Sequence, residues 1–399
     1  MPALPEIGID WDACINLMLR AMQLLQQGAL QLLSLLGIAH EVDGQPAWPF
    51  ALRLSGEVML IDRSVARALL AALACTGAAL LLTALAIAWR RARIALLLAA
   101  IALLLFTPWP QADLLTAQAT PTSFHQSASG FSAASIVRGE QVYRQQCIAC
   151  HGADGKGNTP LALSLPVAPP NLSSGLLWRR FDGDIYWSLR HGKGSMPGYA
   201  GKLSTADSWA LIDYMKANAA GVGIADTGSW PRPIALPDLA LNCRNSSVTH
   251  TGQWRGQRIR LVIGRPGTAA TEDPRMQSLQ LSAGAGSRDT GGDAVGAIAC
   301  ASSDADSLRA IAIITGTSVE KLAGTELLAD RDGWLRARSS GGAWSQSDML
   351  CRSPLASSSS TSSASASPSS SSPEQAGIDQ LIAAMDADPV RFIKGGFVH

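Results

Sequence analysis

The chain has 399 residues, a length that suits two or three folded units rather than one. Its formal net charge of +1 gives no overall basic field that would indicate a nucleic-acid partner. Seven cysteines are too few and too scattered for a disulfide-built scaffold, and their odd number leaves at least one outside intrachain disulfides. The first residues lack a basic stretch ahead of an apolar run, so we expect no cleavable signal peptide.

The first long segment, Ala13–His40, has the pattern of an amphipathic helix. Its polar residues recur every three or four positions and form one stripe, with apolar residues around it. The stripe consists of Asn16, Arg20, Gln23, Gln27, Gln31 and Ser34. Such a helix either lies in the membrane interface or crosses the membrane with the stripe turned to a partner helix, and its wide apolar face slightly favours crossing.

Two apolar runs come next. Ala68–Trp89 carries no charge and is about long enough to cross a bilayer, whereas Ile94–Trp109 is shorter and ends at an aromatic interface anchor. The basic stretch Trp89–Arg93 between them predicts a cytoplasmic turn, because basic loops stay inside. We expect residues 1–110 to anchor the chain in a bacterial inner membrane through two or three helices, with the rest in the periplasm. The alternative is a buried hairpin of a soluble protein.

Composition divides the remainder of the chain. Residues 111–132 are polar and turn-rich and are predicted to be a linker, and residues 133–222 are predicted to form a compact helical module. Residues 223–352 alternate strand-like runs with glycine and serine. The serine-rich residues 353–377 cannot bury enough apolar surface to fold, and residues 378–399 predict a tail with a short amphipathic helix.

The sequence CIACH at Cys147–His151 is the central motif. C-x-x-C-H is the attachment signature of c-type haem, in which each thiol bonds one vinyl group and the following imidazole lies under the iron. The preceding stretch, Ser135–Gln146, has a helical pattern with Ser135 as N-cap, so the motif closes a helix, whereas a thioredoxin motif opens one. A zinc site needs further ligands nearby, and the next cysteine is Cys243. Haem attachment is favoured over thiol redox chemistry and zinc.

A candidate sixth iron ligand follows in HGKGSMPGY, which ends at Tyr199. Met196 lies there in a glycine-rich loop, and its soft thioether sulfur would give His/Met ligation, which raises the haem potential. His191 precedes the loop and is expected at the surface. Met215 lies on a predicted helix, Asp207–Ala219, and is expected in the core. We therefore favour Met196.

Packing signals frame this helical module. Ser204–Asp207 is a capping pattern that starts the last helix, where Trp209 and Tyr214 supply bulk. Gly139 on the first helix would allow the two helices to approach closely. Earlier in the module, Asp182 and Asp184 are more typical of a helix cap and a solvated face than of a catalytic pair.

These motifs, in this order, resemble the small one-haem class I c-type cytochromes. The matching stretches are GEQVYRQQCIACHGADGKG, PPNL, GSMPGY and LSTADSWALIDYMKA, within about a quarter of the chain. The resemblance implies that Cys147 and Cys150 carry thioether bonds to one haem c. It also implies that His151 and Met196 are the axial ligands and that the PPNL segment packs on the haem edge.

The membrane part is similar to the end of copper-resistance protein D family members that carry a fused cytochrome. The similar stretch is WPFALRLSGEV, followed by a span, a basic turn and a second helix. That family normally has many more spans, which puts copper transport by this chain in doubt. A copper site from Cys351, Met385 and His399 would require scattered ligands to converge.

Residues 223–352 resemble thioredoxins and peroxiredoxins. LPDLAL and WRGQRIRLVIG resemble that family's opening hairpin and first central strand, and GTELLADRDGWLRAR, with its Asp-Gly turn, resembles its later hairpin. GRPGTAATEDP stands where a CxxC would follow the central strand, so the catalytic thiols are not carried over. Cys243, Cys300 and Cys351 are expected to be buried small residues, with a disulfide between two of them as an alternative outside the cell.

The sequence thus predicts a multidomain protein with a transmembrane helical anchor, an all-α cytochrome c domain, an α/β thioredoxin-like domain, a disordered serine-rich linker and a short helical tail. We expect it to transfer single electrons through one haem c, in contact with a membrane oxidoreductase or soluble electron carrier and with membrane lipid. We therefore expect an electron-transfer protein rather than a catalyst. The alternatives are a haem-linked thiol or peroxide oxidoreductase and an accessory role in copper handling. The tail is a candidate docking segment for another subunit.

Overall fold

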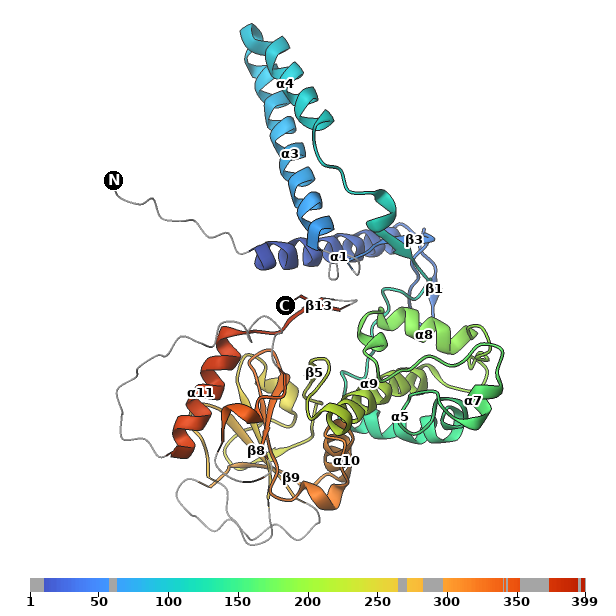
Figure 1. Cartoon of the computed structure of the whole chain (residues 1–399), viewed down its shortest axis with the longest axis vertical. Coiled ribbons are helices and arrows are strands. Elements are labelled where there is room, and N and C mark those ends of the chain that lie inside the picture. The colour runs from blue at the N-terminus through green and yellow to red at the C-terminus, as the bar shows by residue number, and fades with distance from the viewer. Residues whose placement is uncertain are drawn as a thin grey trace. The chain divides into compact units, whose positions relative to one another are not determined.

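The computed structural model of the protein describes residues 11–56, 63–264, 271–282, 297–339, 341, 344–351, 373–393 and 396–398. These residues form two units. The first comprises the residues up to Phe124 together with Arg391–Val398, and the second runs from His125 to Val390. Figure 1 follows the chain through both units. Most of the predicted serine-rich linker, residues 353–377, lies outside the described residues.

The first unit contains three long helices. α1 covers Trp11–Leu35, α3 covers Arg63–Ala88 and α4 covers Arg93–Leu105, with a short 3-10 turn at Arg90–Ala92. α3 and α4 lie side by side as the expected helical hairpin (Figure 1). Among the described helices, Ser64–Ala88 within α3 is the one long and apolar enough to cross a membrane. α4 has 13 residues, fewer than the about 20 that a crossing helix needs.

The segment predicted as a turn-rich linker, residues 111–132, has local structure of its own. It contains a 3-10 turn at Ala112–Leu114, and its strand β4, Thr116–Gln118, pairs antiparallel with β3, Leu52–Leu54. Further along, the Ser123 hydroxyl accepts a hydrogen bond from the Thr120 amide. Hydroxyl side chains that bond to nearby backbone make such a polar segment compatible with a fixed turn. A second small pair of strands joins β1, Glu41–Val42, to β2, Gln45–Pro46.

The second unit begins with a helical part built around α5 and α9. The helices are α5 (Ala133–Gln146), α6 (Ile148–His151), α7 (Pro160–Ser164), α8 (Asp182–His191) and α9 (Thr205–Thr227). α5 and α9 pack closely, because a Cβ on Gly139 would lie 2.0 Å from the Ala210 carbonyl oxygen. The Tyr143 and Tyr214 rings meet 5.1 Å apart beside this contact. The glycine therefore has the close-approach role that the sequence predicted.

Two details of this helical part differ from expectation. The N-cap of α5 is Ser132, whose side chain accepts from the Ser135 amide, while the Ser135 hydroxyl donates to buried Asp213 at 2.7 Å. Asp184 is buried rather than solvated, because α8 turns it into the protein. The cap of α9 is Ser204, as predicted.

The rest of the second unit is a mixed sheet with two helices. The described strands are β5 (Ile234–Ala235), β6 (Asn242–Cys243), β7 (Ile259–Ile263), β8 (Gln277–Leu281), β9 (Cys300–Ser302), β10 (Glu326–Ala329) and β11 (Trp334–Ser339). Their order is β5-β11-β10-β7-β8-β9-β6. β7, β8 and β9 run parallel, and the other neighbouring pairs are antiparallel.

The stretch LPDLAL, predicted to belong to an opening hairpin, forms a short antiparallel bridge in which Ala240 pairs with His250. The Leu241 amide donates to the Thr249 carbonyl at 2.9 Å, and the Thr251 amide donates to the Leu239 carbonyl at 3.0 Å. β5 and β6 lie at opposite edges, because β5 pairs with β11 while a Cys243–Cys300 disulfide joins β6 to β9. The later hairpin is present as predicted, with β10 and β11 antiparallel. At its turn Gly333 has a φ of +84°, and the Asp330 carboxylate accepts hydrogen bonds from the amides of Asp332 and Trp334.

The C-terminal helix α11, Pro373–Ala387, belongs to this α/β part. Its apolar residues Ile378, Leu381 and Met385 lie three or four positions apart and pack with Leu328 and Trp344. α11 therefore completes the α/β core, and its apolar face is already buried. The chain then forms an antiparallel pair of strands, β12 (Arg391–Ile393) and β13 (Gly396–Val398).

The other helix, α10 (Ala305–Ile314), joins the sheet to the α5–α9 pair. A Cβ on Gly221 of α9 would lie 1.9 Å from the Ile313 carbonyl oxygen, so the two backbones touch. The guanidinium of Arg309 donates two hydrogen bonds to the Glu140 carboxylate of α5. The helical and α/β parts therefore share a tightly packed contact.

Candidate functional site

The end of α5 places the central motif. Cys147 ends that helix, and α6 continues as one turn in which the His151 amide donates to the Cys147 carbonyl at 2.9 Å. Residues three and four positions apart share one face of a helix. Cys147, Cys150 and His151 therefore project together, and both cysteines are free thiols.

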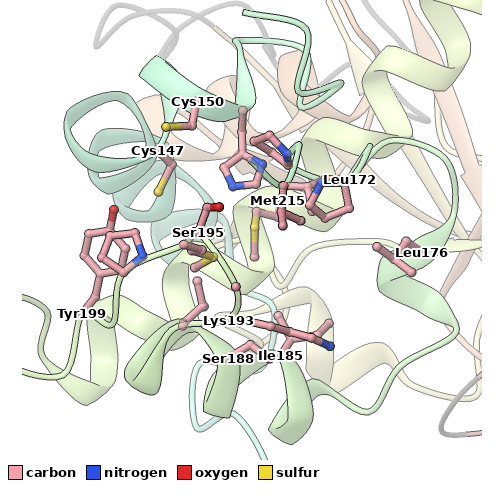
Figure 2. Close-up of a pocket in the computed structure, with 18 of the residues that line it drawn as sticks. Cys147, Cys150, Leu172, Leu176, Ile185, Ser188, Lys193, Ser195, Tyr199 and Met215 are labelled. Atoms are coloured by element: carbon pink, nitrogen blue, oxygen red, sulfur yellow. The ribbon is translucent and has the colours of Figure 1, made fainter. Parts of the chain in front are cut away.

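The motif faces a cavity of about 730 Å³ with mostly apolar walls (Figure 2). All four predicted site residues line it, namely Cys147, Cys150, His151 and Met196. Figure 2 shows the two cysteines at one end of the cavity and Leu176 at the other, with Met215 between them. Met215 is buried, as expected of a core residue, and its side chain also forms part of the wall.

The loop that carries Met196 is fixed by its own backbone. The backbone groups of Lys193 and Met196 bond reciprocally at 3.0 and 3.1 Å. Gly192 has a φ of +82°, and a Cβ there would lie 2.6 Å from the Met196 carbonyl oxygen, so the turn requires glycine. The Tyr199 hydroxyl donates to the Gln146 carbonyl at 3.2 Å, which ties this loop to the end of α5.

The opposite wall is held by the segment after the motif. The Gly157 amide donates to the His151 carbonyl at 2.9 Å, and a Cβ on Gly157 would lie 2.8 Å from the Pro169 carbonyl oxygen. Pro169 and Pro170, predicted to pack on a haem edge, line the cavity. The turn behind the motif is held by the Tyr143 hydroxyl, which donates to the Gly152 carbonyl at 2.8 Å.

The cavity suits neutral groups. Burial raises the pKa of Cys147 to about 12, with a smaller contribution from Cys150, so its thiol stays protonated. Redox-active CxxC pairs require the opposite shift. Burial lowers the pKa of His151, which favours the neutral imidazole that binds metals, and its Nδ1 has no hydrogen-bond partner among the described residues.

These residues fit a c-type haem. Two unpaired thiols lie beside a neutral imidazole with an unpartnered nitrogen, a soft thioether lines the same cavity, and the remaining wall is mostly apolar. A zinc site gains no support, since the described residues contain no group of three or more His, Cys, Asp or Glu that could hold a metal ion. His191, the other candidate ligand, is exposed and stacks on Trp187 at 3.6 Å.

The hydrogen bonds of the two tyrosines that hold the site, Tyr143 and Tyr199, were not predicted from the sequence. Tyr143 precedes Cys147 by four positions, one helical turn, and this spacing was the available signal. Tyr199 follows Met196 by three positions, but only the folded loop brings its hydroxyl to α5. Neither contact can be inferred from residue type alone.

Candidate residues outside the cavity have other roles. Cys243 and Cys300 form the disulfide already described, the outcome that the sequence left as an alternative. Cys351 is buried, and burial raises its pKa to about 11. Met385 belongs to the α/β core, and His399 lies outside the described residues. The structure therefore gives no support to a copper site from Cys351, Met385 and His399.

Comparison with known proteins identifies part of the chain. Residues 134–215 match the family model of cytochrome c oxidase, cbb3-type, subunit III. The thiosulfate dehydrogenase of Stutzerimonas stutzeri (strain A1501) is 36% identical over 95 residues. That match covers 23% of this chain and 29% of the relative, so the chain spans less than a third of the relative's length. The matched segment is a c-type cytochrome domain, which implies covalently bound haem c.

A solved structure, the reducing HAO-like protein complex of Kuenenia stuttgartiensis, also aligns with this chain. The alignment covers 29% of this chain and 57% of the other, at 21% identity and a TM-score of 0.21.

Proposed function

We propose that the chain is a membrane-anchored periplasmic cytochrome that carries single electrons through one covalently bound haem. The observation that supports this most is that Cys147, Cys150, His151 and Met196 line one apolar cavity within a c-type cytochrome domain. The two thiols would hold the haem, and the imidazole and thioether would be its axial ligands. Bound in this way, haem supplies a one-electron couple.

The chain's own residues fix the loops of this site and give it mostly apolar walls. The hydrogen bonds of Tyr143 and Tyr199 fix the turn after the motif and the methionine loop, and Leu189 and Met215 fill the wall between them. A fixed apolar surrounding limits the reorganisation that accompanies a change of charge. With both axial ligands supplied by the chain, substrate binding at iron is disfavoured.

An apolar rim beside the cavity is the proposed contact for an electron-transfer partner. Leu161 and Leu163 of α7 are exposed, and Val167, also exposed, lines the cavity. Exposed apolar groups next to a cofactor cavity are typical of interaction sites. The partner would be a membrane oxidoreductase or a soluble electron carrier.

Anchoring rests on the α3–α4 hairpin. The span within α3 is followed by the basic turn at Arg90–Ala92, which basic-loop bias places in the cytoplasm. If α4, which packs along α3, returns the chain across the membrane together with the residues that follow it, the cytochrome domain, about residues 133–222, and the α/β domain after it are periplasmic. We propose a thioredoxin-like α/β domain, supported by a central β7 with parallel β8 on one side and the antiparallel β10–β11 hairpin on the other.

The test uses absorption spectra of full-length protein made with a haem-attachment system. Oxidised wild-type protein should show a low-spin haem with the weak long-wavelength band of methionine ligation. Met196→Ala should lose that band and lower the reduction potential, while Met215→Ala, the control in the same cavity, should keep the band. Loss of the band in Met215→Ala alone would reassign the ligand. A high-spin wild-type spectrum would contradict the carrier function.

A second measurement separates a carrier from an enzyme. Because the matched relative is named a thiosulfate dehydrogenase, thiosulfate is the small donor to try. A carrier that takes electrons from a protein partner should remain oxidised when thiosulfate alone is added. Rapid reduction of the haem by thiosulfate would show that this chain oxidises a small substrate itself.

A further inference from the structure

Helix α1 has one face buried within the first unit. The residues on this face, separated by one, three or four positions, are Ile15, Met18, Leu19, Met22, Gln26 and Leu30. The first four pack with Val65 and Ala66 at the start of α3. Gln26 accepts a hydrogen bond from the Leu54 amide at 2.7 Å, so this face is also bound to β3.

The other two faces of α1 differ sharply in polarity. The predicted polar stripe, from Asn16 to Ser34, lies on one flank of the buried face. The other flank is a row of leucines whose exposed fractions lie between 57% and 85%. This leucine face consists of Leu17, Leu24, Leu25, Leu32 and Leu35. So much apolar surface on one helix side calls for an apolar surrounding.

The orientation of α1 within its unit indicates what covers the leucine face. The residues of α3 that pack on α1 are confined to its first turns, Val65–Leu70. Figure 1 shows α1 lying across the beginning of α3, while α3 and α4 extend away from it together. A helix that crossed the membrane beside α3 would pack along its length, as α4 does. α1 instead lies where α3 would enter the bilayer.

We propose that α1 lies flat on the periplasmic membrane surface, with its leucine face in the lipid and its polar stripe towards water. The inference rests on the proposed anchoring by α3. An amphipathic helix of 25 residues in this position would sink its apolar face about 5–10 Å into the boundary between headgroups and acyl chains. The lipid surface is the occupant because the leucine face continues from the base of the proposed span.

The test measures the depth of spin labels on α1 in full-length, haem-loaded protein in phosphatidylcholine vesicles. Cys14, Cys75 and Cys351, the free cysteines outside the haem motif, are replaced by alanine, and single cysteines are placed at three positions of the leucine face, Leu17, Leu24 and Leu32. Accessibility to oxygen and to a water-soluble nickel chelate reports depth. All three labels should lie at the same shallow depth.

Two control labels mark the water-exposed and the deeply buried limits of the measurement. A label at Gln27, on the polar stripe, should be accessible to nickel, and a label at Leu80 of α3 should lie deep in the bilayer. A depth that rises and then falls from Leu17 to Leu32 would show that α1 crosses the membrane. Leucine-face labels accessible to nickel, or shielded from both reagents, would show water or a protein partner there; both results overturn the proposal. If Leu80 is also in water, the anchoring itself fails.

Discussion

The α5–α9 helix pair has two sides that differ in packing: one borders a cavity, and the other packs against α10. Around the CIACH motif it borders a hollow, mostly apolar cavity whose loops are tied to α5 by the hydroxyls of Tyr143 and Tyr199. Towards α10 it is packed without space, since Gly221 meets the backbone of Ile313 and Glu140 pairs with Arg309. The hollow side has room for a cofactor, and the close-packed side joins the helix pair to the α/β part of the unit.

The largest expected effect is on the hollow side. In His151→Ala, haem should remain attached through the thiols, but the low-spin spectrum should be lost completely because one axial ligand is gone. Absorption and electron paramagnetic resonance spectra measure this change. His191→Ala, which alters the exposed imidazole stacked on Trp187, is the control and should leave the spectrum unchanged. A low-spin His151→Ala protein with a normal potential would remove His151 from the ligand set.

Between the two helices themselves, Gly139→Ala should be costly. The new Cβ has no room beside the Ala210 carbonyl, so α5 and α9 must separate, and overpacking of this kind lowers the free energy of unfolding by about 1–3 kcal/mol or more. Denaturant unfolding followed by haem absorption measures the loss. At Gly201 nothing lies within 4 Å, so Gly201→Ala should change stability little. Equal stability of the two variants would contradict the close approach.

On the close-packed side, Gly221→Ala should weaken the contact between α9 and α10 without affecting the cavity. Its Cβ would collide with Ile313, so α10 should loosen, with faster amide exchange in Ala305–Ile314 and a destabilisation of about 1–3 kcal/mol. The haem spectrum should not change, because the cavity residues are not displaced. A spectral change as large as that of an axial-ligand variant would show that the two sides are not independent.

A smaller effect is expected for the ion pair at the same contact. Burial acts to raise the pKa of Glu140, but Arg309 and then Arg144 outweigh it and hold that pKa below its ordinary value. A carboxylate with a lowered pKa stabilises the fold above its unfolded-state pKa, and the contribution is lost as pH falls through the lowered value. Arg309→Ala removes the main opposing charge, so the pKa of Glu140 should rise and acid unfolding should begin at higher pH.

The cost of Arg309→Ala near neutral pH should be about 1 kcal/mol, because the arginine is partly exposed. Arg138→Ala breaks a more exposed pair between α5 and Asp207 of α9 and should shift the acid midpoint less. Acid titrations of the two variants, followed by circular dichroism, give the comparison. A larger shift of the acid midpoint for Arg138→Ala than for Arg309→Ala would contradict the assignment of Arg309 as the main partner of Glu140.

The contrast between the two sides also explains what the sequence could predict. Spacing of three and four positions was enough to place Cys147, Cys150 and His151 on one face, and a glycine opposite bulky residues was enough to predict a close helix contact at Gly139. Such signals are local or arise from one residue type. They predicted the helical hairpin of the first unit and the β10–β11 turn for the same reason.

Long-range pairings were beyond such signals. Nothing in the residues around Cys243 shows that its partner is Cys300, 57 positions away, or that β5 and β6 occupy opposite sheet edges. α11 was predicted as part of a short helical tail that could dock on another subunit; its apolar face packs on the core around Leu328 and Trp344, which no local signal indicates. Likewise Met215 is both a core residue and part of the cavity wall, which becomes apparent only once the cavity is formed.

The most direct test of the haem site is the intact mass of full-length protein made with a haem-attachment system, before and after acid–acetone extraction. The wild-type chain should carry the mass of one haem, and the haem should survive extraction. The Cys147→Ser/Cys150→Ser double variant should have the mass of the bare chain, whereas Cys351→Ser should keep the haem. Haem that is extracted from the wild type, or that remains on the double variant, would contradict covalent attachment at these two cysteines.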